Sequence, residues 1–347
     1  MDLKDKADLI VVGSARGGTQ AGNVVNFAVH VTRVVKGDPT AAGANLPVSW
    51  NLSSYMAGSM ANASFTAAGN GLWFLRNAVG GWQLLPVSNG DLVDFKDTFF
   101  PQPSGPILSV YAYSPTASLA EAVASEVCFA LESMGNAQRF SWYSVSLDQL
   151  NSPITQRLYN RLSASGDMSR KILGLSGLIR EGNIQALATA AQLAPSLGNY
   201  QLELGVLSDA IRNNFRSTDP SAIQSLGAIT TASTDVDPYL RQGAAFALRA
   251  IHTQNALPYL AALLDDPDAN LRAAGIGGLS CFANGLPIQT PANVVNMAYL
   301  QYPASAPFQT ADTKANFGMG VEISKNEAAY LSFWKNWWAQ NRTALGY

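Results

Sequence analysis

Two stretches of the sequence repeat each other at a constant offset of 31 residues: DVDPYLRQGAAFAL at 235–248 and DPDANLRAAGIGGL at 266–279. In this alignment Asp235 matches Asp266, and Arg241 matches Arg272. The small residues that follow each arginine allow neighbouring helices to approach closely. Residues 257–266, between the copies, have the pattern of an amphipathic helix with a proline in its first turns, a position that proline tolerates. The pattern predicts helix pairs that stack, because one pair cannot bury both of its faces.

The segment 254–283 resembles the HEAT repeat, with Pro258, Asp266, Leu271 and Arg272 at the matching places. The resemblance implies an α-solenoid over about residues 155–300, clearest at 235–283. It also implies a structural repeat ladder, in which an aspartate caps the following helix and an arginine reaches that aspartate or the one in the next repeat. The expected members of this ladder are Asp235, Arg241, Asp266 and Arg272. Weaker copies are expected at 169–178 and in the pair 183–193 and 200–215.

Aromatic residues line one side of a helix expected at 326–342. They fall at the positions i, i+4, i+7 and i+8, which share a helix face: Tyr330, Trp334, Trp337 and Trp338. Two interpretations remain open. The helix could cap the end of the solenoid, because a terminal repeat must cover an otherwise exposed apolar face. Alternatively, the four residues could form an aromatic surface that binds a peptide or a sugar.

Residues 1 to about 115 differ from the rest of the chain, since they contain no Glu and show segments in which apolar and polar residues alternate. The alternation at 25–31 predicts a half-buried strand, and further strands are expected at 8–13, 47–51, 71–76 and 82–87. We interpret the glycines of 13–18 as a hairpin loop. Five or more short strands with Gly-rich turns indicate a small antiparallel barrel or sandwich. Three prolines at 101–106 favour an extended crossing. We therefore expect an all-β domain at 1–105 and a helical domain at 116–347.

The motifs DLIVVG (8–13), VVKGD (34–38) and GLWFL (71–75) resemble those of small OB-like or netrin-module-like barrels. Such barrels occur in exported bacterial proteins ahead of helical repeats. The metalloprotease inhibition known for some of them depends on an N-terminal cysteine that this chain lacks, so that activity is not carried over. The whole chain is thus expected to combine a β-barrel or sandwich, a HEAT-like α-solenoid and a Trp-rich C-terminal capping helix.

Composition and motifs argue against several classes of function. A net charge of −2 without a Lys/Arg cluster argues against nucleic-acid binding. No run approaches the roughly 18 apolar residues that span a bilayer, so membrane insertion is not expected. Cys128 and Cys281 lie in apolar helical surroundings that favour buried thiols. His30 and His252, the two histidines, belong to no metal-ligand spacing. We therefore assign no metal ligand, no cofactor and no catalytic residue.

The charged share of only 13% is typical of exported bacterial proteins. We expect a periplasmic or extracellular protein whose signal peptide is missing from this chain, with a cytoplasmic protein as the alternative. The expected function is a non-enzymatic protein-interaction scaffold that binds a protein or peptide on the solenoid surface or in the groove between the barrel and the solenoid. One alternative is an exported carbohydrate- or peptide-binding module that uses exposed aromatics. Another is an enzyme whose carboxylates converge only in the folded chain.

Overall fold

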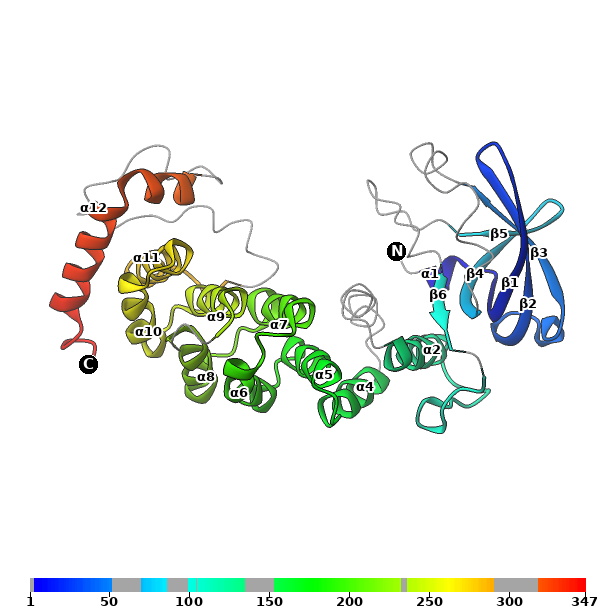
Figure 1. The fold of residues 1–347 in the computed structure, drawn as a ribbon, viewed down its shortest axis with the longest axis horizontal. Helices are drawn as coiled ribbons and strands as arrows, with labels where there is room; N and C mark the ends of the chain where they lie inside the picture. The colour runs from blue at the N-terminus through cyan, green and yellow to red at the C-terminus, as the bar shows by residue number, and fades with distance from the viewer. Residues whose placement is uncertain are drawn as a thin grey trace. The chain divides into compact units, whose positions relative to one another are not determined.

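A computed structural model describes residues 3–51, 70–85, 99–103, 105–134, 153–231, 236–289 and 318–347. An N-terminal β-sheet region is followed by helices (Figure 1). Contacts divide the chain into two compact units, Met1–Leu158 and Tyr159–Tyr347. We call them the β unit and the helical unit.

Five strands of the β unit pair around a closed circuit. These five are β1 (Leu9–Ala21), β2 (Val24–Lys36), β3 (Asn45–Asn51), β4 (Asn70–Ala78) and β5 (Gly81–Leu84), and a sixth strand is β6 (Phe99–Gln102). The circuit runs β1-β2-β3-β5-β4 and returns to β1, and β6 pairs with β4. The β3–β5 pairing is parallel, which differs from the antiparallel sheet expected from the sequence. The reason is topological, because a ring of five strands cannot be closed by antiparallel steps alone.

The β unit has an apolar core to which its strands contribute alternate residues. The expected alternation in β2 is confirmed, since Val25, Phe27, Val29 and Val31 are buried. Trp73 of β4 joins this core and donates from Nε1 to the carbonyl of Gly13 at 2.7 Å.

The prediction of a hairpin loop at 13–18 is wrong. The β1 strand continues through these residues by shifting its register against β2, and the chain turns only between Ala21 and Val24.

Helix α2 (Leu119–Met134) belongs to the β unit, although the sequence placed it after the boundary at 101–106. It packs against β2 and β6. The carboxylate of Glu126 is fully buried there and accepts hydrogen bonds from Arg33 Nε (3.0 Å), Arg33 Nη2 (2.7 Å) and the Tyr113 hydroxyl (3.0 Å). Burial and the Glu126 carboxylate raise the pKa of Tyr113, so its hydroxyl remains a donor. An ion pair whose carboxylate is buried thus joins α2 to the sheet.

We expect Glu126→Gln to destabilise the β unit by about 3 kcal/mol, because breaking a buried ion pair leaves the other charge uncompensated. Asp5→Asn is the matched control, since Asp5 pairs with Lys4 at the surface and such pairs contribute little. Unfolding in urea is monitored by hydrogen exchange of the backbone amides in β2 and α2, so that the measurement reports on the β unit alone. Equal stability of the two variants would contradict the assignment.

The helical unit is built from two layers of helices (Figure 1). Its helices are α5 (Met168–Arg180), α6 (Ile184–Leu193), α7 (Gln201–Asn214), α8 (Pro220–Thr231), α9 (Pro238–Ile251), α10 (Leu257–Ala262), α11 (Ala269–Ala283) and α12 (Gly318–Asn341). A further helix, α4 (Pro153–Ser163), spans the division between the units. Helices α5, α7, α9 and α11 pack in series in the first layer, and α6, α8 and α10 form the second.

Glycine permits a close contact between α4 and α5. A Cβ atom on Gly174 of α5 would lie 2.2 Å from the Ser163 nitrogen and 2.7 Å from the Leu162 carbonyl carbon. These are backbone atoms of α4, which cannot rotate away. By contrast, a Cβ atom on Gly205 of α7 would meet nothing within 4 Å. One glycine is therefore required by packing, while the other lies at an open surface.

The two glycines should respond oppositely to alanine. Gly174→Ala should destabilise the helical unit by about 1–3 kcal/mol through overpacking. Gly205→Ala should stabilise it by about 0.5–1 kcal/mol, because alanine is the better helix former. Thermal unfolding followed by circular dichroism at 222 nm measures both. A stabilising effect of Gly174→Ala would show that α4 and α5 are not in this contact.

Candidate binding surface

Helices α9 and α11 begin with the same arrangement of polar side chains. Asp237 caps α9 by accepting a hydrogen bond from the Tyr239 amide at 2.9 Å, and Asp268 caps α11 by accepting one from the Asn270 amide at 2.7 Å. Each cap also receives a side-chain amide from the preceding helix of the first layer: Gln201 Nε2 lies 3.0 Å from Asp237, and Gln242 Nε2 lies 2.9 Å from Asp268. The caps therefore lie two residues after the aspartates to which the sequence analysis assigned capping.

The expected ladder residues make ion pairs along the same edge. Arg241 of α9 pairs with Asp266, ahead of α11, and both side chains are nearly buried, at 12% and 10% exposure. Arg241 Nε also donates to the Thr230 carbonyl at 3.1 Å. Arg272 binds Glu327 of α12 instead of another repeat, with its Nε 2.8 Å from Oε1. Asp235 lies outside the described residues.

Asp265 and Asp266 are adjacent in sequence but differ in burial, so substituting each one distinguishes a contact of the ladder from an exposed surface charge. We expect Asp266→Asn to destabilise the helical unit by about 2 kcal/mol, because it weakens a charge-assisted hydrogen bond in a nearly buried site. Asp265→Asn should have no measurable effect, since Asp265 is 76% exposed and pairs with the exposed Lys335. Urea titration of both variants provides the comparison. A loss at Asp265 as large as that at Asp266 would contradict the ladder.

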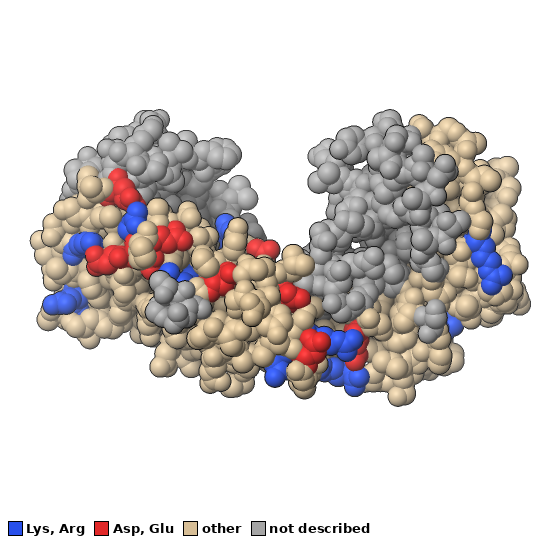
Figure 2. Space-filling model, viewed as in Figure 1, with Lys and Arg blue, Asp and Glu red and all other residues tan. Residues whose placement is uncertain are grey.

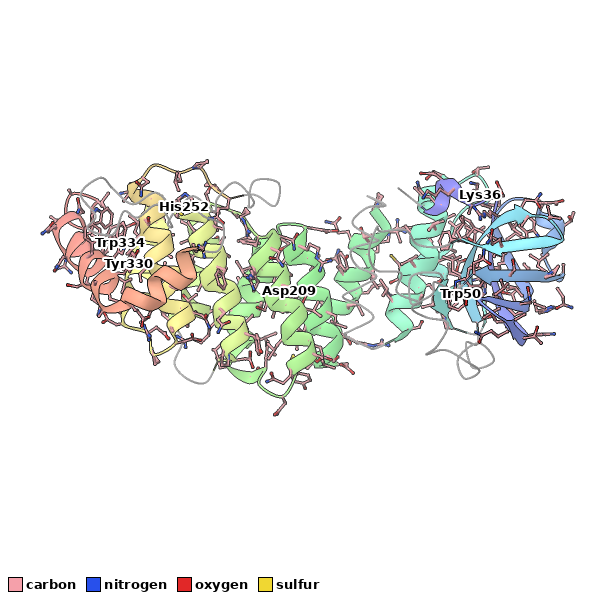
Figure 3. The ribbon with its side chains drawn as sticks, turned by 90° about the horizontal axis from the view of Figure 1, so that it is seen from above. Lys36, Trp50, Asp209, His252, Tyr330 and Trp334 are labelled. Atoms are coloured by element: carbon pink, nitrogen blue, oxygen red, sulfur yellow. The ribbon has the colours of Figure 1, made fainter. Side chains whose placement is uncertain are left out.

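The aromatic stripe of α12 is mostly used in packing. Tyr330 and Trp334, labelled in Figure 3, are fully buried, while Trp337 and Trp338 are half-buried. Helix α12 packs against α10 and α11, and the ring centroid of Trp337 lies 6.5 Å from that of Phe282. The interpretation as an aromatic surface is therefore wrong for Tyr330 and Trp334, because the helix turns these side chains inward.

An open face lies on two neighbouring helices of the first layer. Its residues are Leu202, Gly205, Asp209 and Arg212 on α7, and Tyr239, Gln242, Phe246 and Arg249 on α9. The two sets share the spacing i, i+3, i+7 and i+10, which places each set on one side of its helix. Leu202 and Tyr239 are each 68% exposed. We call these eight residues the α7–α9 face; Asp209 is labelled in Figure 3.

The flanking helices of the same layer differ. Residues 172–179 of α5 and residues 274–281 of α11 are buried on all sides. Exposed apolar side chains therefore concentrate on the middle two helices of the layer. Sequence reasoning missed this face, because the equivalence of α7 with α9 depends on a register that the weak repeat at 200–215 did not establish.

Arginines gather at the C-terminal end of the α7–α9 face. The guanidinium carbon of Arg212 lies 4.4 Å from the Phe246 ring centroid, and that of Arg249 lies 5.7 Å from it, both within the range of cation–π attraction. Arg216 follows α7 and donates to the carbonyls of Gln289 (2.7 Å), Phe215 (2.7 Å) and Arg212 (2.8 Å). Burial lowers the pKa of Arg216. Elsewhere on the helical unit, the side that Figure 2 presents shows acidic and basic residues interspersed.

A hollow of about 160 Å³ lies in the β unit between β2, β3 and the β4–β5 turn. Pro47, Ser49 and the half-buried Trp82 are among its lining residues, and Val79 at its rim is fully exposed. In this hollow an aromatic ring and polar groups adjoin an open space.

The two cysteines and His252 are buried in the fold. Cys128 and Cys281 are free and buried, and burial raises the pKa of Cys281 to about 11, so its thiol remains protonated at neutral pH. His252 is buried at the end of α9, with its ring nitrogens 3.0 Å from the Arg249 carbonyl and 2.8 Å from the Leu286 carbonyl. Among the described residues, no three His, Cys, Asp or Glu side chains form a group that could hold a metal ion.

No helix in the described part of the chain is both long and apolar enough to cross a membrane. No protein-family model, curated protein or solved structure matches the chain.

Proposed function

We propose that this protein is a non-enzymatic interaction scaffold whose helical unit binds a protein or peptide on the α7–α9 face. The observation that carries the proposal is the exposure of Leu202 and Tyr239 at equivalent positions of adjacent helices, beside α5 and α11, whose middle segments are buried on all sides. Clustered exposed apolar side chains are typical of interaction sites. Stacked helix pairs present such surfaces without catalysing a reaction.

The fold supports this function. We infer that the closed circuit of strand pairings makes the β unit a small barrel, and that the two helix layers form a HEAT-like solenoid. The ion pair between Arg272 and Glu327 supports a capping role for α12, because it continues the ladder into the last helix. The low charge of the whole chain supports an exported protein.

The energetics require more than two contacts. Burying Leu202 and Tyr239 would contribute about 1.5–3 kcal/mol each. Micromolar affinity corresponds to about 8 kcal/mol. A partner must therefore also engage Phe246 or the arginines beside it, which places it along the length of both helices.

Photo-crosslinking tests the proposal. Tyr239→p-benzoylphenylalanine, expressed in the native host, should form a discrete adduct with a protein on irradiation, and adding Leu202→Ser should abolish the adduct. Gln224→p-benzoylphenylalanine is the control, since Gln224 is exposed on α8 of the second layer. Absence of an adduct at 239, or the same adducts at 239 and 224, would contradict a binding role for this face.

A second candidate function is carbohydrate or peptide binding in the β unit. The hollow beside Trp82 favours it, because aromatic rings next to polar groups suit such ligands. Glycan-array binding that is lost with Trp82→Ala and kept with Leu202→Ser would favour this function over the scaffold.

A further inference from the structure

We propose that the α7–α9 face binds an acidic, apolar peptide segment, with an apolar side chain against Leu202 and Tyr239 and a carboxylate on Arg212. This inference rests on the proposed function and names the chemistry of the partner. It is carried by three features of the face: its unpaired guanidinium, the ring that orients this group, and the distance to the apolar end.

Arg212 and Arg216, at the C-terminal end of the face, differ from other arginines of the described chain in making no ion pair. Arg33, Arg241 and Arg272 each bind a carboxylate, on Glu126, Asp266 and Glu327. Among the described residues, no carboxylate pairs with Arg212 or Arg216. The donors of Arg216 are taken up by three carbonyl groups. The side-chain N–H groups of Arg212 make no hydrogen bond within the described chain, so this end of the face is complementary to an anion.

The Phe246 ring orients the guanidinium of Arg212. Their separation of 4.4 Å places the cation over the ring, which holds it across the boundary between α7 and α9. An arginine held in this way loses less conformational freedom when it binds a ligand. Its planar fork can donate two parallel hydrogen bonds to a carboxylate. A carboxylate therefore fits this position better than a neutral polar group.

The distance between Leu202 and Arg212 determines how far apart the apolar and the acidic residue of the bound peptide must lie. Leu202 and Arg212 are ten positions apart on α7, which is about 15 Å along the helix axis. An extended peptide covers this distance in four or five residues. Gly205 leaves open space between the ends, and the exposed Asp209 disfavours an acidic residue there. The expected segment thus has a bulky apolar residue, a neutral or basic middle, and Asp or Glu four or five positions away.

A peptide fits the face better than a nucleic acid does. Leu202 and Tyr239 supply apolar area that a phosphate backbone cannot use. The chain as a whole carries a net charge of −2, whereas nucleic-acid binding relies on clustered positive charge.

Selection of random peptides tests the inference. A phage-displayed library of random 12-residue peptides is selected against the full chain, and enriched peptides are measured by fluorescence anisotropy. We expect Asp or Glu four or five positions from a bulky apolar residue. Affinity should fall about tenfold with Arg212→Gln, the loss of one charge-assisted contact, and should weaken with added salt. Arg157→Gln, at an exposed arginine on α4, should leave affinity unchanged.

The outcomes separate this inference from the proposed function. Peptides that lose binding with Leu202→Ser but not with Arg212→Gln would overturn the carboxylate contact and leave the scaffold standing. Failure to enrich any peptide, or displacement of the peptide by an equal concentration of RNA oligonucleotide, would also overturn the inference. The crosslink at position 239 decides the scaffold independently. Circular dichroism of each variant confirms that the fold is retained.

Discussion

The ion pair between Arg241 and Asp266 is the contact on which the arrangement of the helical unit depends. It joins α9 to the turn that begins α11, in a nearly buried site where an unpaired charge would be costly. The side-chain amides of Gln201 and Gln242 extend the same edge by binding the caps Asp237 and Asp268. Sliding one helix by a residue would break several of these contacts together. The polar edge therefore fixes the register in which the apolar faces meet.

That register also determines which surface remains open. Leu202 and Tyr239 are each the second residue of their helix, and Arg212 reaches the Phe246 ring across the boundary between α7 and α9. Helix α12 ends the edge through Glu327 and buries Tyr330 and Trp334. The aromatic residues that dominate the C-terminal sequence therefore stabilise the stack, while a less conspicuous set on α7 and α9 faces solvent. The binding hypothesis moves accordingly from α12 to these helices.

Local patterns in the sequence predicted the elements better than they predicted the contacts between them. The repeat at 235–279 predicted α9 and α11, and the alternation at 25–31 predicted β2, because both depend on the spacing of neighbouring residues. The pairing of Arg33 with Glu126 joins residues 93 positions apart, so no local pattern placed α2 in the β unit. The same holds for the parallel β3–β5 pairing. Helical spacing showed that Trp334 and Trp337 lie on the same side of α12. It could not show that packing would bury Trp334 fully and Trp337 only in part.

Tyrosine nitration of the isolated full chain is the measurement that tests the open α7–α9 face most directly. Tetranitromethane modifies accessible tyrosines, and the face contains Tyr239 at 68% exposure, whereas Tyr330 of α12 is fully buried. Peptide mapping by mass spectrometry should find Tyr239 nitrated in the folded protein and Tyr330 nitrated only after unfolding. Protection of Tyr239 in the folded chain would contradict the account, because it would show that the face is already covered and has no room for a partner.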